Sequence, residues 1–257
     1  MKINTSTNTI EYINQMFDIM EDNKNLASMF LDILHNSQNI VAQYNNKLSY
    51  FDNIKNLFEI DKDFINYYKK YNLEKSFVMQ NIDEYLNNPY VKNIKLNKII
   101  IDDKHKFEEL KYLPYECFLC KNIHIDSSYL EHIKIGYFTK EYSYLTLLED
   151  ESIWMLITPH EINTMKEAVN NAKGNVVTFG LGLGYYAYMC SIKEDVKSVT
   201  IIERDCKTIN LFKKYILPQF ENKDKIKSLM QMLSNIVVNL LITIMDLLIY
   251  IKMNKMV

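Results

Sequence analysis

Hydrophobic residues recur at helical spacing through the first third of the chain. Apolar side chains three and four residues apart run from Ile10 to Met20 and again from Leu26 to Leu34, which is the pattern of an amphipathic helix. We therefore predict a helical region over residues 1–98. Such stripes are most often the core faces of a helical domain, although they would also suit a partner-binding groove.

The helical pattern extends almost to the end of this region. Residues 64–71 and 77–86 keep the same spacing. The chain then reaches Asn88 and Pro89, and the residue before a proline is biased away from helical geometry. We expect the last helix of the region to stop there.

The period of the pattern changes near Ile99. Short runs rich in β-branched and aromatic residues follow one another, which is typical of strands. They cover residues 99–101, 123–125, 133–138, 142–148 and 153–157. The sequence thus predicts a small β segment over residues 99–157.

A helix start follows this β segment. Thr158 can cap the helix, Pro159 suits its first position, and Glu161 completes a capping box. We expect the helix to run to about Lys173 and to stop at Gly174 in a left-handed conformation.

Glycine is concentrated in one short stretch. Four of the five glycines of the chain lie between Gly174 and Gly184. Residues 176–179 are an apolar run suited to a buried parallel strand, and Gly180 and Gly182 follow directly. A turn without Cβ atoms lets a ligand press against the backbone and against the N–H groups at the start of a helix.

The residues after the glycines complete a cofactor-site pattern. Residues 185–192 are helical in character, and residues 198–202 form a second apolar run that ends in Glu203. An acidic side chain at the tip of the next strand, about 20 residues on, accepts hydrogen bonds from ribose hydroxyls in nucleotide-binding folds. The segment therefore predicts a nucleotide-cofactor site.

The strings VVTFGLGLG and TIIERD resemble the first two motifs of class I S-adenosylmethionine-dependent methyltransferases, including their polyamine-synthase-like relatives. That family commonly carries a helix before the first strand, as residues 159–173 would provide. The resemblance covers about residues 175–220. It implies an α/β fold in which residues 158–227 are the first, incomplete part of a Rossmann-like sheet, and it implies methyl transfer to an unidentified acceptor.

The resemblance also implies which residues hold the cofactor. The three glycines would lie against its amino-acid end, Glu203 would hold the ribose diol, and Arg204 and Asp205 would flank the adenine. The implied cofactor-binding residues are Gly180, Leu181, Gly182, Gly184, Glu203 and Arg204. Many family members carry Asp or Glu two residues before the first glycine, where this chain has Thr178, a departure that bears on cofactor affinity.

Two other functions stay open. The residues from Gly182 to Ala187 also match the dinucleotide fingerprint, which would indicate an NAD-linked oxidoreductase. The second alternative is a non-catalytic helical interaction protein with a vestigial cofactor fold. Tyr185 and Tyr186 would suit the methyl site, but helix packing is the expected role of at least one of them. Because methyl transfer depends mainly on positioning, we assign no catalytic residue.

The last part of the chain departs from the family pattern. A third strand ending in an acidic residue is expected next, but residues 228–257 contain no glycine or proline and favour an atypical apolar helical tail instead. A membrane anchor over residues 236–251 is disfavoured, because that span is short for a bilayer and contains Asn239 and Asp246.

A shift of reading frame would explain this tail. Read one base earlier with AT-rich codons, the stretch from Lys227 encodes Ile-Ile-Asn-Ala-Asp-Ala-Phe-Lys-Tyr, which suits the missing strand with its acidic end. We therefore hypothesise that a single-nucleotide shift near Lys227 and Ser228 truncated a longer methyltransferase-like protein. A half sheet would leave an unpaired edge, so we expect poor solubility or weak cofactor binding.

Composition and charge narrow the remaining classes. The net charge of −2 gives no electrostatic signal for nucleic-acid binding. The N-terminus lacks the continuous apolar stretch of a signal peptide, so the cytoplasm is the expected location. Cys117 and Cys120 form a lone CxxC, for which zinc or redox chemistry is the alternative to two reduced, partly buried thiols.

Overall fold

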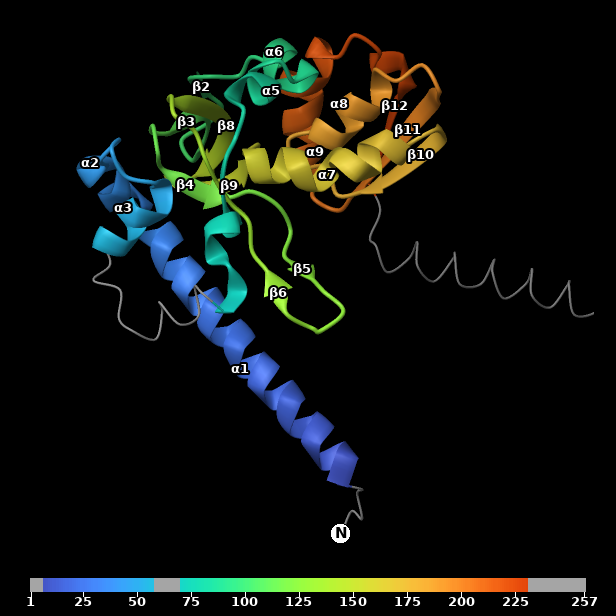
Figure 1. Cartoon of the computed structure of the whole chain (residues 1–257). Coiled ribbons are helices and arrows are strands. Elements are labelled where there is room, and N and C mark those ends of the chain that lie inside the picture. Colours follow the sequence, from blue (N-terminus) through green and yellow to red (C-terminus); the bar gives the residue numbers. More distant parts are fainter. Residues whose placement is uncertain (1–6, 58–69, 231–257) are drawn as a thin grey trace, which may run out of the picture. The chain divides into compact units, whose positions relative to one another are not determined.

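The computed structural model of the protein describes residues 7–57 and 70–230 (Figure 1). The described chain is mixed α/β, with a long N-terminal helix and several small sheets. It divides into two compact units. Unit 1 holds the described parts of residues 1–86, 109–144 and 158–164, and unit 2 holds those of residues 87–108, 145–157 and 165–257. The boundary expected at residue 98 lies inside a segment of unit 2, whereas the one expected at residue 157 falls where the chain passes from unit 2 to unit 1.

The helices of unit 1 lie mainly at its N-terminal end. They are α1 (Thr7–His35), α2 (Ser37–Gln43), α3 (Tyr50–Leu57), the 3-10 helix η1 (Leu73–Ser76) and α5 (Ile82–Leu86). The second half of α1 contributes to a buried core that also takes side chains from α2, α3 and two strands. That core comprises Leu26, Phe30, Ile33, Ile40, Tyr50, Ile54, Leu73, Cys117, Leu130, Ile133 and Ile135.

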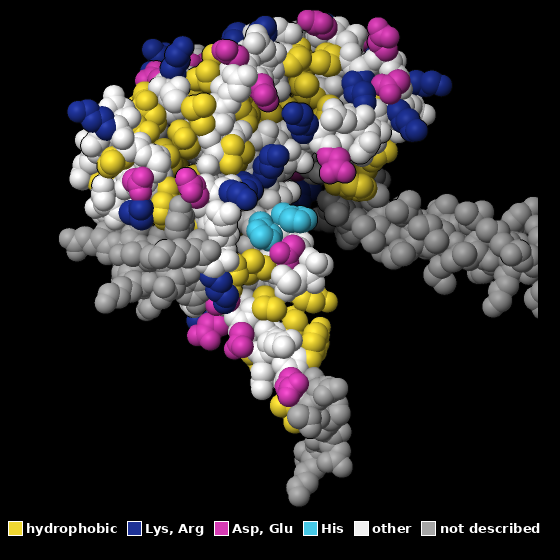
Figure 2. Space-filling view, in the orientation of Figure 1, with side chains coloured by type: hydrophobic (Ala, Val, Ile, Leu, Met, Phe, Trp, Pro, Cys, Tyr) yellow, Lys and Arg dark blue, Asp and Glu magenta, His cyan; other side chains and the backbone are white. Residues whose placement is uncertain are grey.

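The first half of α1 does not belong to this core. Ile10, Ile13, Phe17 and Met20 are 48%, 41%, 63% and 62% exposed, and hydrophobic side chains are visible along this part of the helix (Figure 2). The helix itself was predicted correctly, but the expectation that its whole apolar stripe faces a core is wrong. Helical spacing places side chains on one face, and it does not say what covers that face.

The end of the predicted helical region also differs from expectation. Residues 77–86 contain strand β1 (Phe77–Met79) before α5, because β1 pairs in parallel with β7 (Ile135–Tyr137). Helix α5 ends at Leu86, close to the stop expected at Asn88 and Pro89, but Asn88 then starts a further helix. Its side chain accepts hydrogen bonds from two backbone N–H groups of α6 (Pro89–Asn93), with the proline at the first turn. The prediction for residues 64–71 falls mainly outside the described residues.

Three small sheets follow the helices. Strands β1, β7 and β4 (Cys117–Leu119) form one sheet, and β5 (His124–Ile125) with β6 (Glu131–His132) forms an antiparallel hairpin. The third sheet has the order β2 (Ile99–Ile100), β3 (His105–Tyr112), β8 (Tyr142–Glu149) and β9 (Ser152–Leu156). The expected β segment is therefore present, although the charged strand β3 was not predicted.

Unit 2 contains a parallel three-stranded sheet with the order β10, β11, β12. It follows α7 (Pro159–Asn171), and helices α8 and α9 connect its strands. The bounds are β10 (Gly174–Phe179), α8 (Tyr185–Ser191), β11 (Val196–Glu203), α9 (Cys206–Leu211) and β12 (Ile226–Met230). Gly174 has φ +64°, the left-handed conformation expected at that position.

The third strand of this sheet corrects a prediction. The sequence pattern suggested that no such strand follows the second one, yet residues 226–230 pair in parallel with β11, and the backbone of Met230 aligns with that of Glu203. The apolar tail assigned to residues 228–257 therefore begins within a strand, because a short apolar run takes the conformation that its neighbour's hydrogen bonds impose. The remainder of that tail, with the span disfavoured as a membrane anchor, lies outside the described residues.

Membrane-spanning helices can be looked for in the described residues only. Within residues 7–57 and 70–230, no helix combines the length and the apolar character needed to cross a bilayer.

Candidate functional site

The turn between β10 and α8 is built on glycines in left-handed conformations. Gly180, Gly182 and Gly184 have φ angles of +85°, +53° and +78°, where residues with a Cβ are strained. A Cβ on Gly180 or Gly182 would meet no atom within 4 Å, whereas one on Gly184 would lie 2.7 Å from Cε2 of Phe212. The first two glycines therefore leave an open backbone surface, and the third serves packing.

Glu203 at the end of β11 ties this turn to the neighbouring strand. Its Oε2 accepts the N–H of Leu181 at 2.9 Å, and its Oε1 accepts the N–H groups of Arg204 at 2.8 Å and Asp205 at 3.0 Å. The β10 ladder also continues into the turn, since the N–H of Gly180 donates to the Ile202 carbonyl at 2.8 Å. The structure thus places Glu203 beside the glycines, as the spacing predicted.

These bonds limit what Glu203 can offer a ligand. A carboxylate has about four lone-pair sites, and three are taken by the backbone N–H groups. The remaining site can accept one hydroxyl. A grip on both hydroxyls of a ribose would require Glu203 to release one of its bonds, and the bond to Leu181 is the one that faces the glycine turn.

The two residues after Glu203 have different environments. Arg204 is exposed, so its guanidinium is accessible to a ligand. Asp205 is the N-cap of α9, and its carboxylate accepts hydrogen bonds from the N–H groups of Lys207 and Thr208 and, at 2.6 Å, from the Thr208 hydroxyl. The Asp205 side chain is therefore occupied by the helix start, which leaves it little capacity to bind an adenine.

Replacing Asp205 with Ala should lower the free energy of unfolding by about 1 kcal/mol at neutral pH, the usual loss for an N-cap. The hydrogen bond from the Thr208 hydroxyl is the main cause that lowers the pKa of Asp205. A lowered folded-state pKa stabilises the fold above the pKa of an unfolded aspartate, and this contribution disappears as pH falls through the folded value. Urea denaturation at several acidic pH values should show the gap between wild type and variant closing.

Asp205→Asn is the matched control for this prediction. Asparagine caps helices about as well as aspartate, so this variant should match the wild type at neutral pH and lack the acid-dependent loss. A gap between wild type and Asp205→Ala that stays constant through the acidic range would contradict the assignment.

A segment far away in sequence forms hydrogen bonds with the glycine turn and with α8. The Asn88 side-chain amide donates to the Tyr185 hydroxyl at 2.9 Å, and Asn93 donates to the Tyr188 hydroxyl at 2.7 Å. The Tyr90 hydroxyl donates to the carbonyl of Leu183 within the turn itself. Sequence reasoning missed this segment because residues 1–98 were assigned to a separate helical region, although the Asn-Pro cap was a usable signal.

The two tyrosines that begin α8 differ in accessibility. Tyr185 is buried and forms the bond to Asn88, so it packs the helix. Tyr186 is half-buried, and burial is the main cause that raises its pKa to about 12. At neutral pH Tyr186 is thus a neutral phenol, and it is the more accessible of the two.

A second polar cluster of unit 2 lies close to α9 and was also not predicted. His105 is buried, with its Nδ1 2.6 Å from Asp102 and its Nε2 3.1 Å from Glu149. The Lys207 ammonium lies 3.4 Å from the Glu149 carboxylate and 5.8 Å from the ring centre of Trp154. The hydrogen bond from His105 is the main cause that lowers the pKa of Asp102 to about 2. The cluster fastens the first turn of α9 to the neighbouring strands.

The CxxC thiols lie in unit 1 and are buried and free, in agreement with the simpler expectation. Burial is the main cause that raises the pKa of Cys117 to about 12 and that also raises the pKa of Cys120. The thiolate is the reactive and metal-binding form, so both side chains are poor nucleophiles here. Among the described residues, no group of three or more His, Cys, Asp or Glu side chains is arranged to hold a metal ion.

The glycine turn is therefore the candidate site with the clearest geometry. It combines open backbone at Gly180 and Gly182, one carboxylate with spare capacity, and an accessible guanidinium at the carboxyl ends of parallel strands, where ligands bind in open α/β sheets. Comparison with protein-family models, with curated proteins and with solved structures found no match to this chain.

Proposed function

We propose that unit 2 binds S-adenosylmethionine at the glycine turn and transfers its methyl group to an acceptor that is not yet identified. The observation that carries the proposal is the open backbone of Gly180 and Gly182 beside the carboxylate of Glu203. Such a surface admits a ligand in close contact with the main chain, and the carboxylate next to it can accept a ribose hydroxyl.

The order of strands and helices supports the same proposal. A helix precedes β10, and the sequence β10–α8–β11–α9–β12 has parallel strands with a helix in each connection. This order would suit the first part of a doubly wound α/β sheet, in which nucleotides lie at the carboxyl ends of the strands. The methyltransferase-like motifs lie on these elements.

The residues in the turn fit the cofactor in distinct ways. Gly180 and Gly182 would lie against its amino-acid end, and the spare lone-pair site of Glu203 would accept a ribose hydroxyl. Arg204 would lie beside the adenine. Leu181 and Gly184 would hold the shape of the turn, because the first is bonded through its N–H to Glu203 and the second leaves space for Phe212. The bound cofactor would supply an electrophilic methyl group on a sulfonium sulfur.

Equilibrium dialysis with S-adenosylhomocysteine and, separately, with NADH tests the proposal. We expect the wild-type protein to retain S-adenosylhomocysteine and not NADH. Glu203→Gln should weaken that binding by at least about tenfold, because an amide presents an N–H₂ group to backbone donors and loses the charge-assisted hydrogen bond to the ligand.

Glu194→Gln is the matched control, since Glu194 is an exposed carboxylate of the same unit ahead of β11. It removes the same charge and should leave binding unchanged. The Leu181 amide gives a second readout, because a ligand that competes for Glu203 must shift its NMR resonance. Retention of NADH instead would favour an oxidoreductase. Retention of neither ligand by the folded protein would favour a non-catalytic interaction protein.

A further inference from the structure

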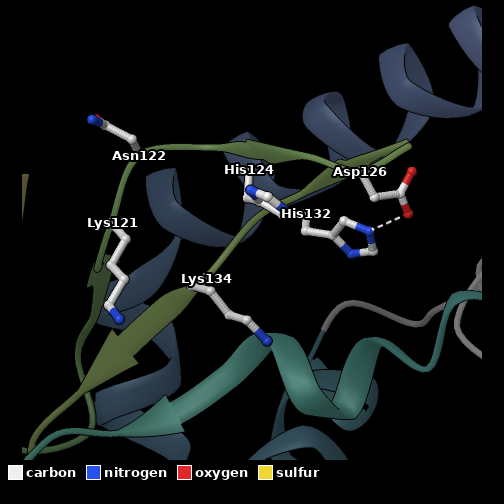
Figure 3. A pocket seen from close by; sticks show the side chains of 6 residues that line it. All are labelled: Lys121, Asn122, His124, Asp126, His132 and Lys134. Atoms are coloured by element: carbon white, nitrogen blue, oxygen red, sulfur yellow. Dashed lines mark hydrogen bonds and ion pairs between the residues drawn. The ribbon is translucent and has the colours of Figure 1, made fainter. Parts of the chain in front are cut away.

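The β5–β6 hairpin of unit 1 carries a pocket that has no part in the proposed methyl transfer. The pocket has a volume of about 440 Å³, and the side chains that line it are Lys121, Asn122, His124, Asp126, His132 and Lys134. Figure 3 shows both lysine side chains reaching below the hairpin, with the two imidazoles next to each other and Asn122 pointing away. Histidine side chains gather at the surface in the space-filling view as well (Figure 2).

The hairpin is held in place by bonds that its own turn and α1 provide. Oδ1 of Asp126 accepts the N–H groups of Ser128 and Leu130 and the Ser128 hydroxyl, which closes the turn. The Asn23 side chain of α1 donates to the Tyr129 carbonyl at 2.8 Å and accepts the N–H of Glu131 at 2.9 Å. The pocket is therefore supported by a defined backbone.

One of the two imidazoles is oriented by a carboxylate. His132 Nε2 lies 2.8 Å from Oδ2 of Asp126. With Nε2–H donated to this carboxylate, Nδ1 of His132 donates to a ligand in the pocket when the ring is an imidazolium. The His124 ring is the cross-strand partner of this one, with a distance of 6.1 Å between ring centres. The only acidic side chain of the lining is thus occupied by its own turn and by His132.

The two lysines of the lining supply positive charge that is not used in an ion pair with any described residue. In the part of the chain that the structure describes, neither Lys121 nor Lys134 forms an ion pair. Lys134 donates one hydrogen bond to the Lys75 carbonyl. An ammonium group has three N–H donors, so about two donors of Lys134 remain for a ligand. Lys121 is exposed. Two ammonium groups and two imidazoles therefore face one pocket with a single, already bonded carboxylate.

This lining suits an anion better than a cation. A divalent metal would have to approach two ammonium groups, and the three residues His124, Asp126 and His132 are not arranged as a ligand set. A phosphate group, by contrast, has three oxygens that accept charge-assisted hydrogen bonds from lysine and from imidazole N–H groups. The pocket volume leaves room for a small group attached to the phosphate.

We propose that the β5–β6 pocket binds a phosphate group, either free or as the monoester of a small molecule, through Lys121, Lys134, His124 and His132. His132 is positioned by Asp126, and the two lysines supply the charge. The site lies wholly within unit 1 and is independent of the glycine turn in unit 2.

Isothermal titration calorimetry on the full chain tests this proposal with inorganic phosphate, glycerol 3-phosphate and glycerol at constant ionic strength. Both phosphates should bind and glycerol should not. Tighter binding of glycerol 3-phosphate would identify a monoester as the ligand, and equal binding would identify the phosphate group alone. The double variant Lys121→Ala, Lys134→Ala should weaken phosphate binding by at least about tenfold, because two charge-assisted hydrogen bonds are lost.

The control is the double variant Lys47→Ala, Lys140→Ala. Both of these lysines are exposed, belong to unit 1 and lie outside the hairpin, so the change in net charge is the same. It should bind phosphate like the wild type. Equal loss of binding in the two double variants would reduce the effect to overall charge and overturn the proposal. A wild-type protein whose backbone resonances for residues 121–134 do not shift on addition of phosphate would also overturn it.

Discussion

Replacing Gly184 with Ala should lower the free energy of unfolding of unit 2 by about 2–5 kcal/mol. The left-handed backbone, at φ +78°, costs a residue with a Cβ about 1–2 kcal/mol. The new Cβ would also lie 2.7 Å from Phe212, whose side chain is 1% exposed and packs edge-to-face on Phe220 with 5.5 Å between ring centres. Overpacking of a closed core typically costs a further 1–3 kcal/mol.

Gly182→Ala is the matched control, because the two glycines share the left-handed backbone and differ in their surroundings. A Cβ on Gly182 meets no atom within 4 Å, so only the backbone strain of about 1–2 kcal/mol remains. Urea denaturation followed by circular dichroism measures both variants. Equal losses would mean that Phe212 moves aside without cost, and the packing role of Gly184 would then be wrong. Gly182→Ala should also reduce the retention of the cofactor, and this reduction should be larger than the loss of free energy of unfolding explains.

The parts of unit 2 that sequence reasoning located share strong local signals. The glycine turn has a backbone conformation that only glycine adopts freely, and three of the five glycines of the chain fall there. Thr178 precedes the turn within an apolar run that forms β10, and Glu203 ends the next strand. Each of these signals depends on a few neighbouring residues, so such features can be predicted from the sequence without knowledge of the rest of the fold.

The parts that were missed depend on contacts between distant residues. Residues 77–79 have helical spacing but form a strand because β7 offers them hydrogen bonds. In the charged strand β3 only His105 and Phe107 are buried. This alternation of buried and exposed positions is short, and the charged residues of the strand make it hard to recognise in the sequence. Residues 10–20 have the same spacing as residues 26–34, yet only the latter reach a core. In each case tertiary neighbours, which the local pattern does not contain, decide the outcome.

The candidate site likewise combines features that the local sequence predicted with features that it did not. The proximity of Glu203 to the glycines followed from spacing, but its three bonds to backbone N–H groups did not. Those bonds change the expected role of Glu203 from a free acceptor of two hydroxyls to one with a single spare site. The contacts of Asn88 and Tyr90 could not be predicted from the sequence either, because about 95 residues separate them from the tyrosines and the turn that they contact.

Tyr90 offers the most direct test of these contacts, and Tyr90→Ala should lower the free energy of unfolding of unit 2 by about 3–5 kcal/mol, the usual cost of deleting a buried aromatic ring. The Tyr90 side chain is 1% exposed. Its ring packs edge-to-face on Tyr185 and Tyr188, with ring centres 5.4 Å and 5.5 Å away, and its hydroxyl donates to the Leu183 carbonyl.

Tyr90→Phe separates the ring from the hydroxyl. Phenylalanine keeps both ring contacts and leaves the Leu183 carbonyl without its donor, which should cost about 1–3 kcal/mol. Because Leu183 lies inside the glycine turn, this variant should also speed hydrogen exchange of the amides of residues 180–184. Asn93→Ala, which removes bonds to Tyr188 and Glu221 but none to the turn, should not. If Tyr90→Ala cost no more than Tyr90→Phe, the ring would contribute nothing. The segment around α6 would then be an attachment to the turn through a single hydrogen bond, and its packing would not be what sets the shape of the site.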